Sequence, residues 1–382
     1  MNKKILIIGA GISGLSAAYH LSFIPEFEVT VIDKGYFMNG ATGRNGAGIR
    51  TQWSTQLNIL LSKYSVEFFE KGETHLDFKD SLEFKQQGYL ILASDENEHE
   101  QFKKNVKLQN ELGIPSQLLN KEETRKIAPL LNLDSFYSAT YCKLDGHLNP
   151  FKVSQAFYLK CLKQGVIFKF FEEILDLKMT YQEIKAVVTN KETYYVDYVI
   201  NCAGSYSKEI ANMAGVDVPV YPEKHEILAT EPVKPILGPM VMSFSKNFYI
   251  QQVPHGPLIM GQGGKHLESS HDQTSTVEFL ENISKTVLEV LPGIGNVRVQ
   301  RQWAGSYDMS PDRSPIISKT DVKNLIVACG FSGRGFMIAP ATGLLIRDLV
   351  LNQKSSIEGI DLKDLSLERF KNELKINELS FV

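Results

Sequence analysis

Residues 1–34 read MNKKILIIGAGISGLSAAYHLSFIPEFEVTVIDK, and this stretch decides the fold. Residues 5–8 form a short apolar run, which is typical of a strand buried on both faces of a parallel sheet. Glycines in the spacing G-x-G-x-x-G follow, and then an apolar helical run over residues 15–21. A second apolar run, residues 29–32, ends in Asp33. This order of strand, glycine turn, helix and strand predicts a doubly wound α/β fold.

The glycines indicate what the turn binds. Gly9 permits the tight turn, Gly11 lets the backbone approach a pyrophosphate, and Gly14 lets the helix pack close to the strand. The phosphates would then lie on the free N–H groups at the positive end of the helix. Asp33, nineteen residues after Gly14, is placed to bind a ribose diol. We therefore expect a dinucleotide-binding unit rather than a glycine-rich turn without a ligand, but the motif alone does not distinguish NAD from FAD.

Length and composition exclude several classes of protein. The 382 residues suffice for two domains or for one large core with insertions. With 43% hydrophobic residues, 22% charged residues and a net charge of −3, the chain is globular and has no basic run for nucleic acid. Its apolar stretches fall short of the ~18 residues that span a bilayer. The amino terminus enters a strand at once, so we expect a cytoplasmic protein without a transmembrane segment.

The cysteines and histidines do not indicate a metal site or disulfides. Cys142, Cys161, Cys202 and Cys329 form no C-x-x-C pair, and we expect buried free thiols. The eight histidines lack metal-ligand spacing such as H-E-x-x-H.

Two later segments also run from a strand into glycine. Residues 198–204 read YVINCAG, and a strand over 325–328 leads into CGFSGRGFM at 329–337. One ligand that contacts all three junctions must be long, and its flavin end would need a cradle of backbone donors. FAD therefore fits better than NAD. The glycine-rich loop YFMNGATGRNGAGIR at 36–50 is either a further ligand contact or a surface loop.

Periodicity and capping residues predict the other elements. We expect a strand over 89–93, and helices over 62–70, over 95–112, after Asn120, after the cap Asn149, and near Pro340. Residues 216–304 are strand-rich, with one helix opened by the capping box Ser275-x-x-Glu278. The apolar stripe of that helix is predicted to comprise Val277, Leu280, Ile283 and Val287.

Six stretches of the chain carry a family resemblance. They are GAGISGLSAAYHL with Asp33, GATGRNGAGIR at 40–50, INCAG at 200–204, KHEILATEP at 224–232, RQWAGSYDMSPDRSPII at 301–317 and GFSGRGFMIAPATG at 330–343. On these residues the chain resembles the D-amino-acid-oxidase-like superfamily of FAD-dependent amine oxidoreductases. Within it, the chain is most similar to the β subunits of sarcosine oxidase and of dye-linked L-proline dehydrogenase.

The resemblance implies which residues hold FAD. The ADP half would be bound by Gly9, Gly11, Ile12, Ser13, Gly14, Asp33 and Lys34, with Ala203 and Gly204 near the adenosine. Arg44, Asn45 and Gly46 would lie over the pyrophosphate and flavin. The pyrimidine ring would be wrapped by Gly330, Phe331, Ser332, Gly333, Arg334, Gly335, Phe336 and Met337.

The resemblance also implies two domains. The FAD-binding domain would be discontinuous and built from residues 1–85, 145–215 and 305–382. Residues 86–144 and 216–304 would form a substrate domain whose antiparallel sheet roofs the cavity.

Several residues depart from the family pattern. Gly305 or a neighbour stands where single-chain sarcosine oxidases attach flavin to a cysteine, so we expect non-covalent FAD. Ile259 stands where oxidases carry a flavin-facing lysine, which favours a dehydrogenase, because a cation stabilises superoxide as it forms. Met337 replaces a substrate-binding lysine and Arg334 replaces a histidine, so the partner of the substrate carboxylate stays open.

Four residues are candidates for positioning the substrate. The Arg50 guanidinium could bind the substrate carboxylate through two parallel hydrogen bonds. The alternatives are that it neutralises an FAD phosphate or forms an ion pair at the surface. Tyr249 and Gln251 alternate in a strand and either face the cavity or pack in the core. His225 is either catalytic or structural.

The function that follows is the dehydrogenation of a small amino or secondary-amine acid, such as L-proline or sarcosine, with an electron acceptor other than oxygen. Direct hydride transfer from Cα to flavin N5 depends mainly on orientation, so we assign no general base. The alternatives are a glycine or D-amino-acid oxidase, and an electron-transfer subunit that needs a partner.

Overall fold

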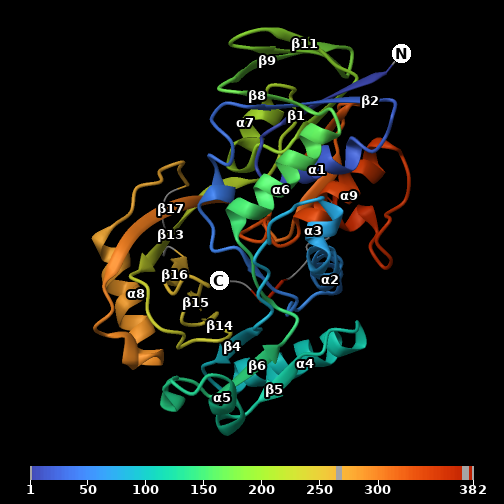
Figure 1. Cartoon of the computed structure of the whole chain (residues 1–382). Coiled ribbons are helices and arrows are strands. Elements are labelled where there is room, and N and C mark those ends of the chain that lie inside the picture. Colours follow the sequence, from blue (N-terminus) through green and yellow to red (C-terminus); the bar gives the residue numbers. More distant parts are fainter. Residues whose placement is uncertain (1, 264–268, 372–377, 381–382) are drawn as a thin grey trace.

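The computed structural model describes residues 2–263, 269–371 and 378–380, and it contains two large β-sheets (Figure 1). The first sheet has six strands in the order β18-β19-β12-β1-β2-β8. Its strands are β1 (Lys3–Ile8), β2 (Phe27–Asp33), β8 (Ile167–Phe170), β12 (Tyr198–Asn201), β18 (Ile316–Lys319) and β19 (Leu325–Cys329). All pairs are parallel except β18 with β19.

Both faces of the six-stranded sheet are covered, as the apolar run of β1 predicts. Ile5 and Ile7 pack in a core with α1 (Ile12–Leu21), α6 (Pro150–Lys163) and α9 (Ala339–Val350). Leu6 and Ile8 pack in a second core with α7 (Ser207–Asn212) and a small sheet of β9 (Ile174–Thr180), β10 (Glu183–Thr189) and β11 (Thr193–Tyr195). The doubly wound α/β class is therefore confirmed.

The second sheet, which we call the roof sheet, has eight strands in the order β17-β13-β16-β15-β14-β4-β6-β5. They are β4 (Tyr89–Ala93), β5 (Gln117–Leu119), β6 (Ser138–Cys142), β13 (Tyr221–Thr230), β14 (Met240–Ser243), β15 (Phe248–Gln252), β16 (Leu258–Gly263) and β17 (Val299–Met309). Helix α8 (Val277–Val290) packs on this sheet. The exact domain boundaries stay a prediction.

The remaining elements connect these layers. They are the helices α2 (Gln56–Glu70), α3 (Gly72–His75), α4 (Glu96–Glu111), α5 (Lys121–Ile127) and α10 (Glu368–Lys371), the strands β3 (Gly48–Ile49) and β7 (Gly146–His147), and the 3-10 turns η1 (Ala41–Gly43), η2 (Leu133–Ser135), η3 (Gly204–Tyr206), η4 (Pro292–Ile294) and η5 (Leu362–Leu365).

Two helix predictions are wrong in detail. Helix α2 begins at Gln56, six residues before the predicted start. Helix α8 is capped by Thr276 and not by Ser275, because the Glu226 carboxylate accepts hydrogen bonds from the Thr276 N–H and hydroxyl. The buried stripe of α8 is consequently Phe279, Ile283, Val287 and Val290, whereas Val277 is 73% exposed.

The caps at Asn120 and Asn149 are confirmed. Asn120 and Glu123 form a reciprocal capping box on α5, and Asn149 accepts hydrogen bonds from the first turn of α6. The four cysteines are free and buried, as expected. Within the described ranges, no helix combines the length and apolarity that crossing a membrane requires. Those ranges also hold no group of three or more His, Cys, Asp or Glu side chains suited to a metal ion.

Helix α1 is held by unusually close contacts. A Cβ atom at Gly14 would overlap the carbonyl of Gly9, and a Cβ atom at Gly343 in α9 would overlap the backbone of Ser16 in α1. These glycines let β1, α1 and α9 approach one another, which fixes the glycine turn at the start of α1.

We expect Gly343→Ala to lower the free energy of unfolding by ~1–3 kcal/mol, the usual cost of overpacking. This loss would come despite the ~1 kcal/mol by which alanine favours a helix over glycine. Gly293→Ala is the matched control, because no heavy atom lies within 4 Å of its Cβ position. Chemical denaturation checks both variants, and equal midpoints would contradict the close-packing argument.

Candidate active site

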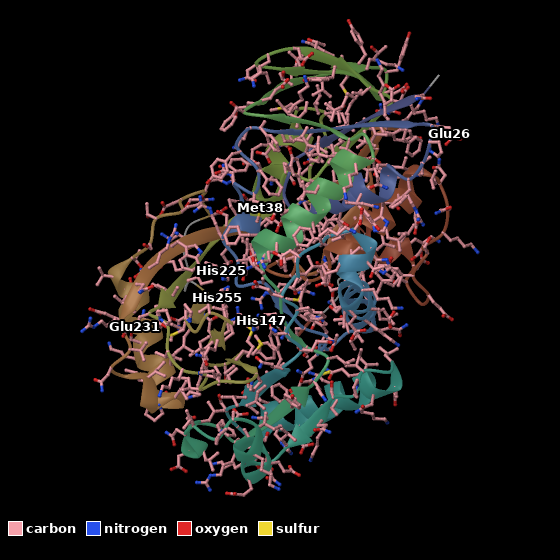
Figure 2. All side chains as sticks on the ribbon, viewed as in Figure 1. Glu26, Met38, His147, His225, Glu231 and His255 are labelled. Atoms are coloured by element: carbon pink, nitrogen blue, oxygen red, sulfur yellow. The ribbon has the colours of Figure 1, made fainter. Side chains whose placement is uncertain are left out.

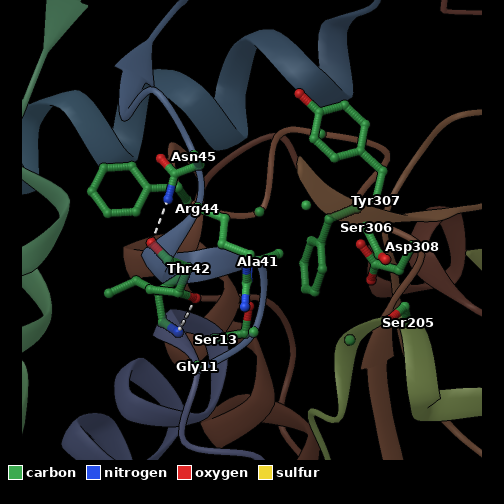
Figure 3. A pocket seen from close by; sticks show the side chains of 18 of the residues that line it. Gly11, Ser13, Ala41, Thr42, Arg44, Asn45, Ser205, Ser306, Tyr307 and Asp308 are labelled. Atoms are coloured by element: carbon green, nitrogen blue, oxygen red, sulfur yellow. Dashed lines mark hydrogen bonds between the residues drawn. The ribbon is translucent and has the colours of Figure 1, made fainter. Parts of the chain in front are cut away.

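One cavity of about 620 Å³ is lined by residues from both large sheets. Its walls include the carboxyl ends of β1, β2 and β12, the loop 39–50, the roof strands, and the loop 331–337. In Figure 3 the residues 41–45 lie on one side of the cavity and β17 lies on the other. The three strand-to-glycine junctions of the sequence therefore meet in one place.

The glycine turn is fixed by side chains that flank it. Both oxygens of Asp33 accept backbone hydrogen bonds, from Ala10 N–H and from Gly35 N–H, each at 2.8 Å. Thr42 Oγ1 accepts the N–H of Ile12 at 3.0 Å. Asp33 thus shapes the turn as well as facing the cavity.

The structure places most of the predicted cofactor residues in the cavity wall. These are Gly9, Gly11, Ile12, Ser13, Asp33, Lys34, Arg44, Asn45, Gly46, Ala203, Gly204, Phe331, Ser332, Gly333, Gly335, Phe336 and Met337. Gly14, Gly330 and Arg334 do not line it. Gly14 packs on Gly9, and Gly330 turns the chain after β19 with a φ of 69°.

The loop 39–50 is tied to the roof sheet. The Trp303 indole N–H donates to the Arg44 carbonyl at 2.9 Å, and Gln251 Nε2 donates to the Gly46 carbonyl at 2.5 Å. Gln251 does not line the cavity, so its visible role is this tether. Tyr249 does line the cavity, with its ring packed over Gly46.

Arg50 lies at the far end of the cavity and is 4% exposed. Its guanidinium stacks 3.7 Å from the Trp53 ring centroid, and Nη2 donates to the Ser380 carbonyl at 2.9 Å. Nη1 lies 3.8 Å from Met242 Sδ. Arg334 lies 4.4 Å from the same Trp53 ring centroid. Two guanidinium groups thus flank one buried indole.

The charges at this end are buried. Glu378 is the carboxylate that acts most strongly on both guanidinium groups. Burial acts to raise its pKa, but the Arg334 charge and hydrogen bonds from Ser54 and Asn58 hold that pKa below its usual value. Burial lowers the pKa of Arg50, and it lowers that of Arg334 to about 10, so both stay protonated at neutral pH. At neutral pH the two cations therefore face Glu378 and a second carboxylate, Asp145, which also acts on Arg50.

Asp145 holds the segment that carries Arg50. Its carboxylate accepts hydrogen bonds from Thr51 N–H at 2.7 Å, Thr51 Oγ1 at 2.6 Å and Gln52 Nε2 at 2.8 Å. Burial raises the pKa of Asp145 to about 6. Asp145 is therefore mostly ionised at neutral pH and loses its negative charge as the pH falls through about 6.

His225 lines the cavity from the roof sheet (Figure 2). Its Nε2 lies 2.9 Å from Glu223 Oε1, and its ring stacks on Tyr307 with centroids 3.7 Å apart. Ile259 pairs with Gln251 across the sheet and does not line the cavity.

Sequence reasoning missed several lining residues. They are Thr42, Trp53, Tyr89, Met240, Met242, Ser306, Tyr307 and Asp308. Three of these lie in the stretch 301–317 that carries the resemblance. Strand alternation assigns only every second residue of that stretch to one face, whereas four consecutive residues of β17, from Gly305 to Asp308, line the cavity.

A model of a family described as "FAD dependent oxidoreductase" matches residues 4–349. The chain belongs to this FAD-dependent oxidoreductase family. The L-proline dehydrogenase of P. horikoshii is 34% identical, with a TM-score of 0.91 over 97% of this chain and 98% of that one. The sarcosine oxidase subunit beta of Rhodobacter capsulatus is 26% identical over 98% of this chain and 90% of that protein. Glycine oxidase from Geobacillus kaustophilus, at 20% identity and a TM-score of 0.87 over 96% of this chain and 99% of that one, shares the fold.

These comparisons confirm the predicted family, the enzyme class and FAD as the cofactor. The residues present fit FAD. Gly11 leaves the backbone open to a pyrophosphate, and the positive end of α1 meets the same cavity as the loop 331–337.

We expect Gly11→Val to abolish FAD binding, because a Cβ at Gly11 already lies 3.2 Å from Thr42 Oγ1 and the added methyl groups would fill the approach of the pyrophosphate. Flavin absorbance of the purified variant checks this, with Gly238→Ala as a control that meets no heavy atom within 4 Å. Acid should release all flavin from the unmodified protein. Flavin that stays on the precipitate would contradict non-covalent binding.

Proposed function

We propose that this enzyme is a dehydrogenase that oxidises a small amino or secondary-amine acid, of the L-proline or sarcosine type, to the imine. The substrate class is that of the similar proteins, L-proline dehydrogenase and sarcosine oxidase subunit beta. Arg50, Tyr249 and His225 are proposed to position the substrate, and Gln251 to hold the loop under it. The predicted FAD-binding residues keep their proposed roles.

The observation that carries the proposal is the buried Arg50 in the cavity wall. Among residues 2–263, 269–371 and 378–380, the acceptor for its Nη1 is the Met242 thioether at 3.8 Å, which is a weak one. A carboxylate is a far stronger acceptor, and the nearby Asp145 carboxylate is hydrogen-bonded to Thr51 and Gln52 instead. An amino acid or an N-alkyl glycine supplies a free carboxylate.

The rest of this end of the cavity suits a small aliphatic body. Trp53, Tyr89, Met240, Met242 and Met337 line it and present apolar surface. Such walls exclude water and hold the Cα–H group in one orientation. Bound FAD supplies the hydride acceptor. The side chains of this protein then need only orient a neutral amine, so no general base is assigned.

We expect Arg50→Lys to weaken substrate binding by roughly 1.5–3 kcal/mol, the range for a hydrogen bond to a charged group, which is about a 10- to 150-fold rise in Kd. The flavin spectrum should not change. Anaerobic bleaching of the flavin by a panel of amino acids measures the effect, and it also identifies the substrate. Arg298→Lys, on the exposed surface, is the control. A variant that loses FAD instead would assign Arg50 to the cofactor phosphates.

The electron acceptor is proposed to be other than oxygen. Among the described residues of the cavity wall the lysine is Lys34, whose Nζ lies 3.2 Å from the centroid of the Tyr206 ring at the nucleotide end. Ile259, which stands where oxidases carry a lysine, does not line the cavity, so the lysines of the cavity wall carry this proposal. If the protein were an oxidase, protonated His225 would be the candidate for the cation that stabilises superoxide.

A second candidate is an electron-transfer subunit of a larger assembly. This alternative is favoured by the similarity to sarcosine oxidase subunit beta, which is by its name one subunit of a larger enzyme. In that case the chain purified alone would bind FAD but would not reduce a dye with any amino acid.

We expect the chain alone to reduce an artificial dye quickly and oxygen slowly. A cation ~4 Å from the forming superoxide is worth ~4 kcal/mol at an effective dielectric near 20. Half of that still corresponds to about a thirtyfold rate difference. Fast hydrogen peroxide production by the unmodified protein would overturn the dehydrogenase assignment, and an inactive monomer in gel filtration would favour the subunit.

A further inference from the structure

Two polar side chains of β17 line the cavity, and each has a buried oxygen without a hydrogen-bond partner among the described residues. Ser306 is 4% exposed and Asp308 is 9% exposed, and both line the cavity. Within the part of the chain that the structure describes, Ser306 Oγ and Asp308 Oδ2 have no hydrogen-bond partner. Buried polar atoms of this kind are rare and costly unless a ligand or water satisfies them.

The two side chains share one face of β17, because they are two residues apart. Across the strand pair they lie opposite Lys224 and Pro222, whereas His225 lies opposite Gly305 on the other face. Figure 3 shows Ser306 and Asp308 beside Ser205, in the turn after β12.

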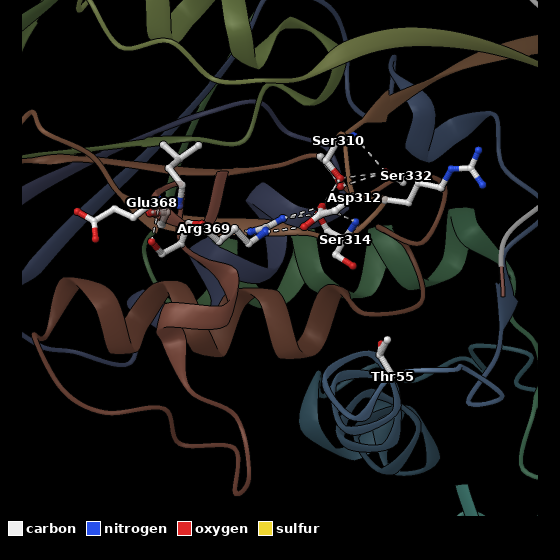
Figure 4. Close-up of polar contacts among 12 residues, drawn as sticks. Thr55, Ser310, Asp312, Ser314, Ser332, Glu368 and Arg369 are labelled. Carbon is white, nitrogen blue, oxygen red and sulfur yellow. Dashed lines mark hydrogen bonds and ion pairs between the residues drawn. The ribbon is translucent and has the colours of Figure 1, made fainter. Parts of the chain in front are cut away.

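The other neighbour of Asp308 is the loop after β19. The backbone carbonyl of Asp308 accepts a hydrogen bond from the N–H of Ser332 in that loop at 3.0 Å. The ion pair of Asp312 with Arg369 and the hydrogen bonds of Ser310 hold the turn that follows β17 (Figure 4). The pair Ser306 and Asp308 therefore stands between the nucleotide end of the cavity and the loop that faces the flavin ring.

The surroundings of Asp308 do not supply a counter-ion. Burial raises its pKa to about 6, and the N–H groups of Phe331 and Gly330 offset part of that rise. The Lys224 ammonium on the same face is paired with Asp272 at 2.8 Å. Burial raises the pKa of the nearby thiols Cys202 and Cys329, so these stay neutral. Further titratable side chains near it include Glu226 on the same face of β13 as Lys224, Glu223, His225 and Tyr307 on the opposite face of the strands, and Tyr206 in η3.

We propose that Ser306 and Asp308 bind the middle of FAD, its ribityl hydroxyls and the adjoining pyrophosphate, and that Asp308 does so as an uncharged carboxyl group. A hydroxyl and a neutral carboxyl group both donate and accept hydrogen bonds, which matches a chain of hydroxyls next to phosphate oxygens. An ionised carboxylate in the same place would repel the pyrophosphate in a site of low dielectric.

The pH dependence follows from the direction of the pKa shift. The protonated form binds FAD more tightly, so bound FAD raises the pKa of Asp308 further. FAD affinity is then full below about pH 6 and falls as the pH rises through the interval between the pKa values without and with FAD. Each pKa unit of coupling is a tenfold change in affinity.

The test is the release of FAD from the holoenzyme after dilution, followed by flavin fluorescence between pH 5 and pH 8.5. The unmodified protein should release FAD about tenfold faster at the upper end, which is one pKa unit of coupling. Asp308→Asn keeps the shape and the neutral polarity, so it should hold FAD with less than about a twofold pH dependence. Asp308→Ala and Ser306→Ala should release FAD faster at every pH.

Two control variants make the outcome decisive. Ser314→Ala removes another buried hydroxyl without a partner that lies outside the cavity, and it should not change FAD release. His225→Gln should keep the pH dependence, because His225 lies on the other face of the strands. The proposal is overturned if Asp308→Ala holds FAD as well as the unmodified protein, or if Asp308→Asn keeps the pH dependence. Either result would leave the dehydrogenase assignment untouched.

Discussion

Helix α1 packs so closely against the end of β1 and against α9 that the contact positions have no room for a Cβ atom. Gly14 lies against the carbonyl of Gly9, and Gly343 lies against the backbone of Ser16. This contact sets where the positive end of α1 points, and therefore where a phosphate can bind. Hydrogen bonds connect the start of α1 to the other walls of the cavity through the loop 39–50. Thr42 binds the helix start, and Gln251 and Trp303 tie the same loop to the roof sheet.

The other end of the cavity is built on charge. Burying two guanidinium groups is costly, and the groups that offset this cost are the Glu378 and Asp145 carboxylates, the Trp53 indole and backbone carbonyls. Both guanidinium groups, those of Arg50 and Arg334, lie within 4.4 Å of the Trp53 ring centroid, and this cation–π contact is attractive for each of them. Under the proposed function, a substrate carboxylate adds the strong acceptor that Arg50 Nη1 lacks among the described residues, which would favour anionic substrates.

The sequence predicts those parts of the structure that obey local rules. The turn from Gly9 to Asp33 and the caps at Asn120 and Asn149 depend on near neighbours, and they are found where predicted. Thr276 caps α8 because Glu226, fifty residues away, binds it. Glu378 reaches Ser54 across 324 residues, and no periodic pattern signals such a contact. Ser306 and Asp308 could not be predicted as lining residues for a different reason. Both faces of β17 meet the same cavity, so the alternation of side chains along a strand does not identify the residues that line it.

The six-stranded sheet has a further consequence for synthesis of the protein. Its central neighbours β1, β12 and β19 span residues 3 to 329, so the amino-terminal turn cannot obtain its last neighbours until the carboxyl-terminal third has left the ribosome. Pairings between such distant segments form slowly, because the loop-closure entropy must be overcome first. The wall of the cavity is therefore complete only after the loop 331–337 has been synthesised, so a ligand that contacts all of its walls would stabilise the protein late in folding.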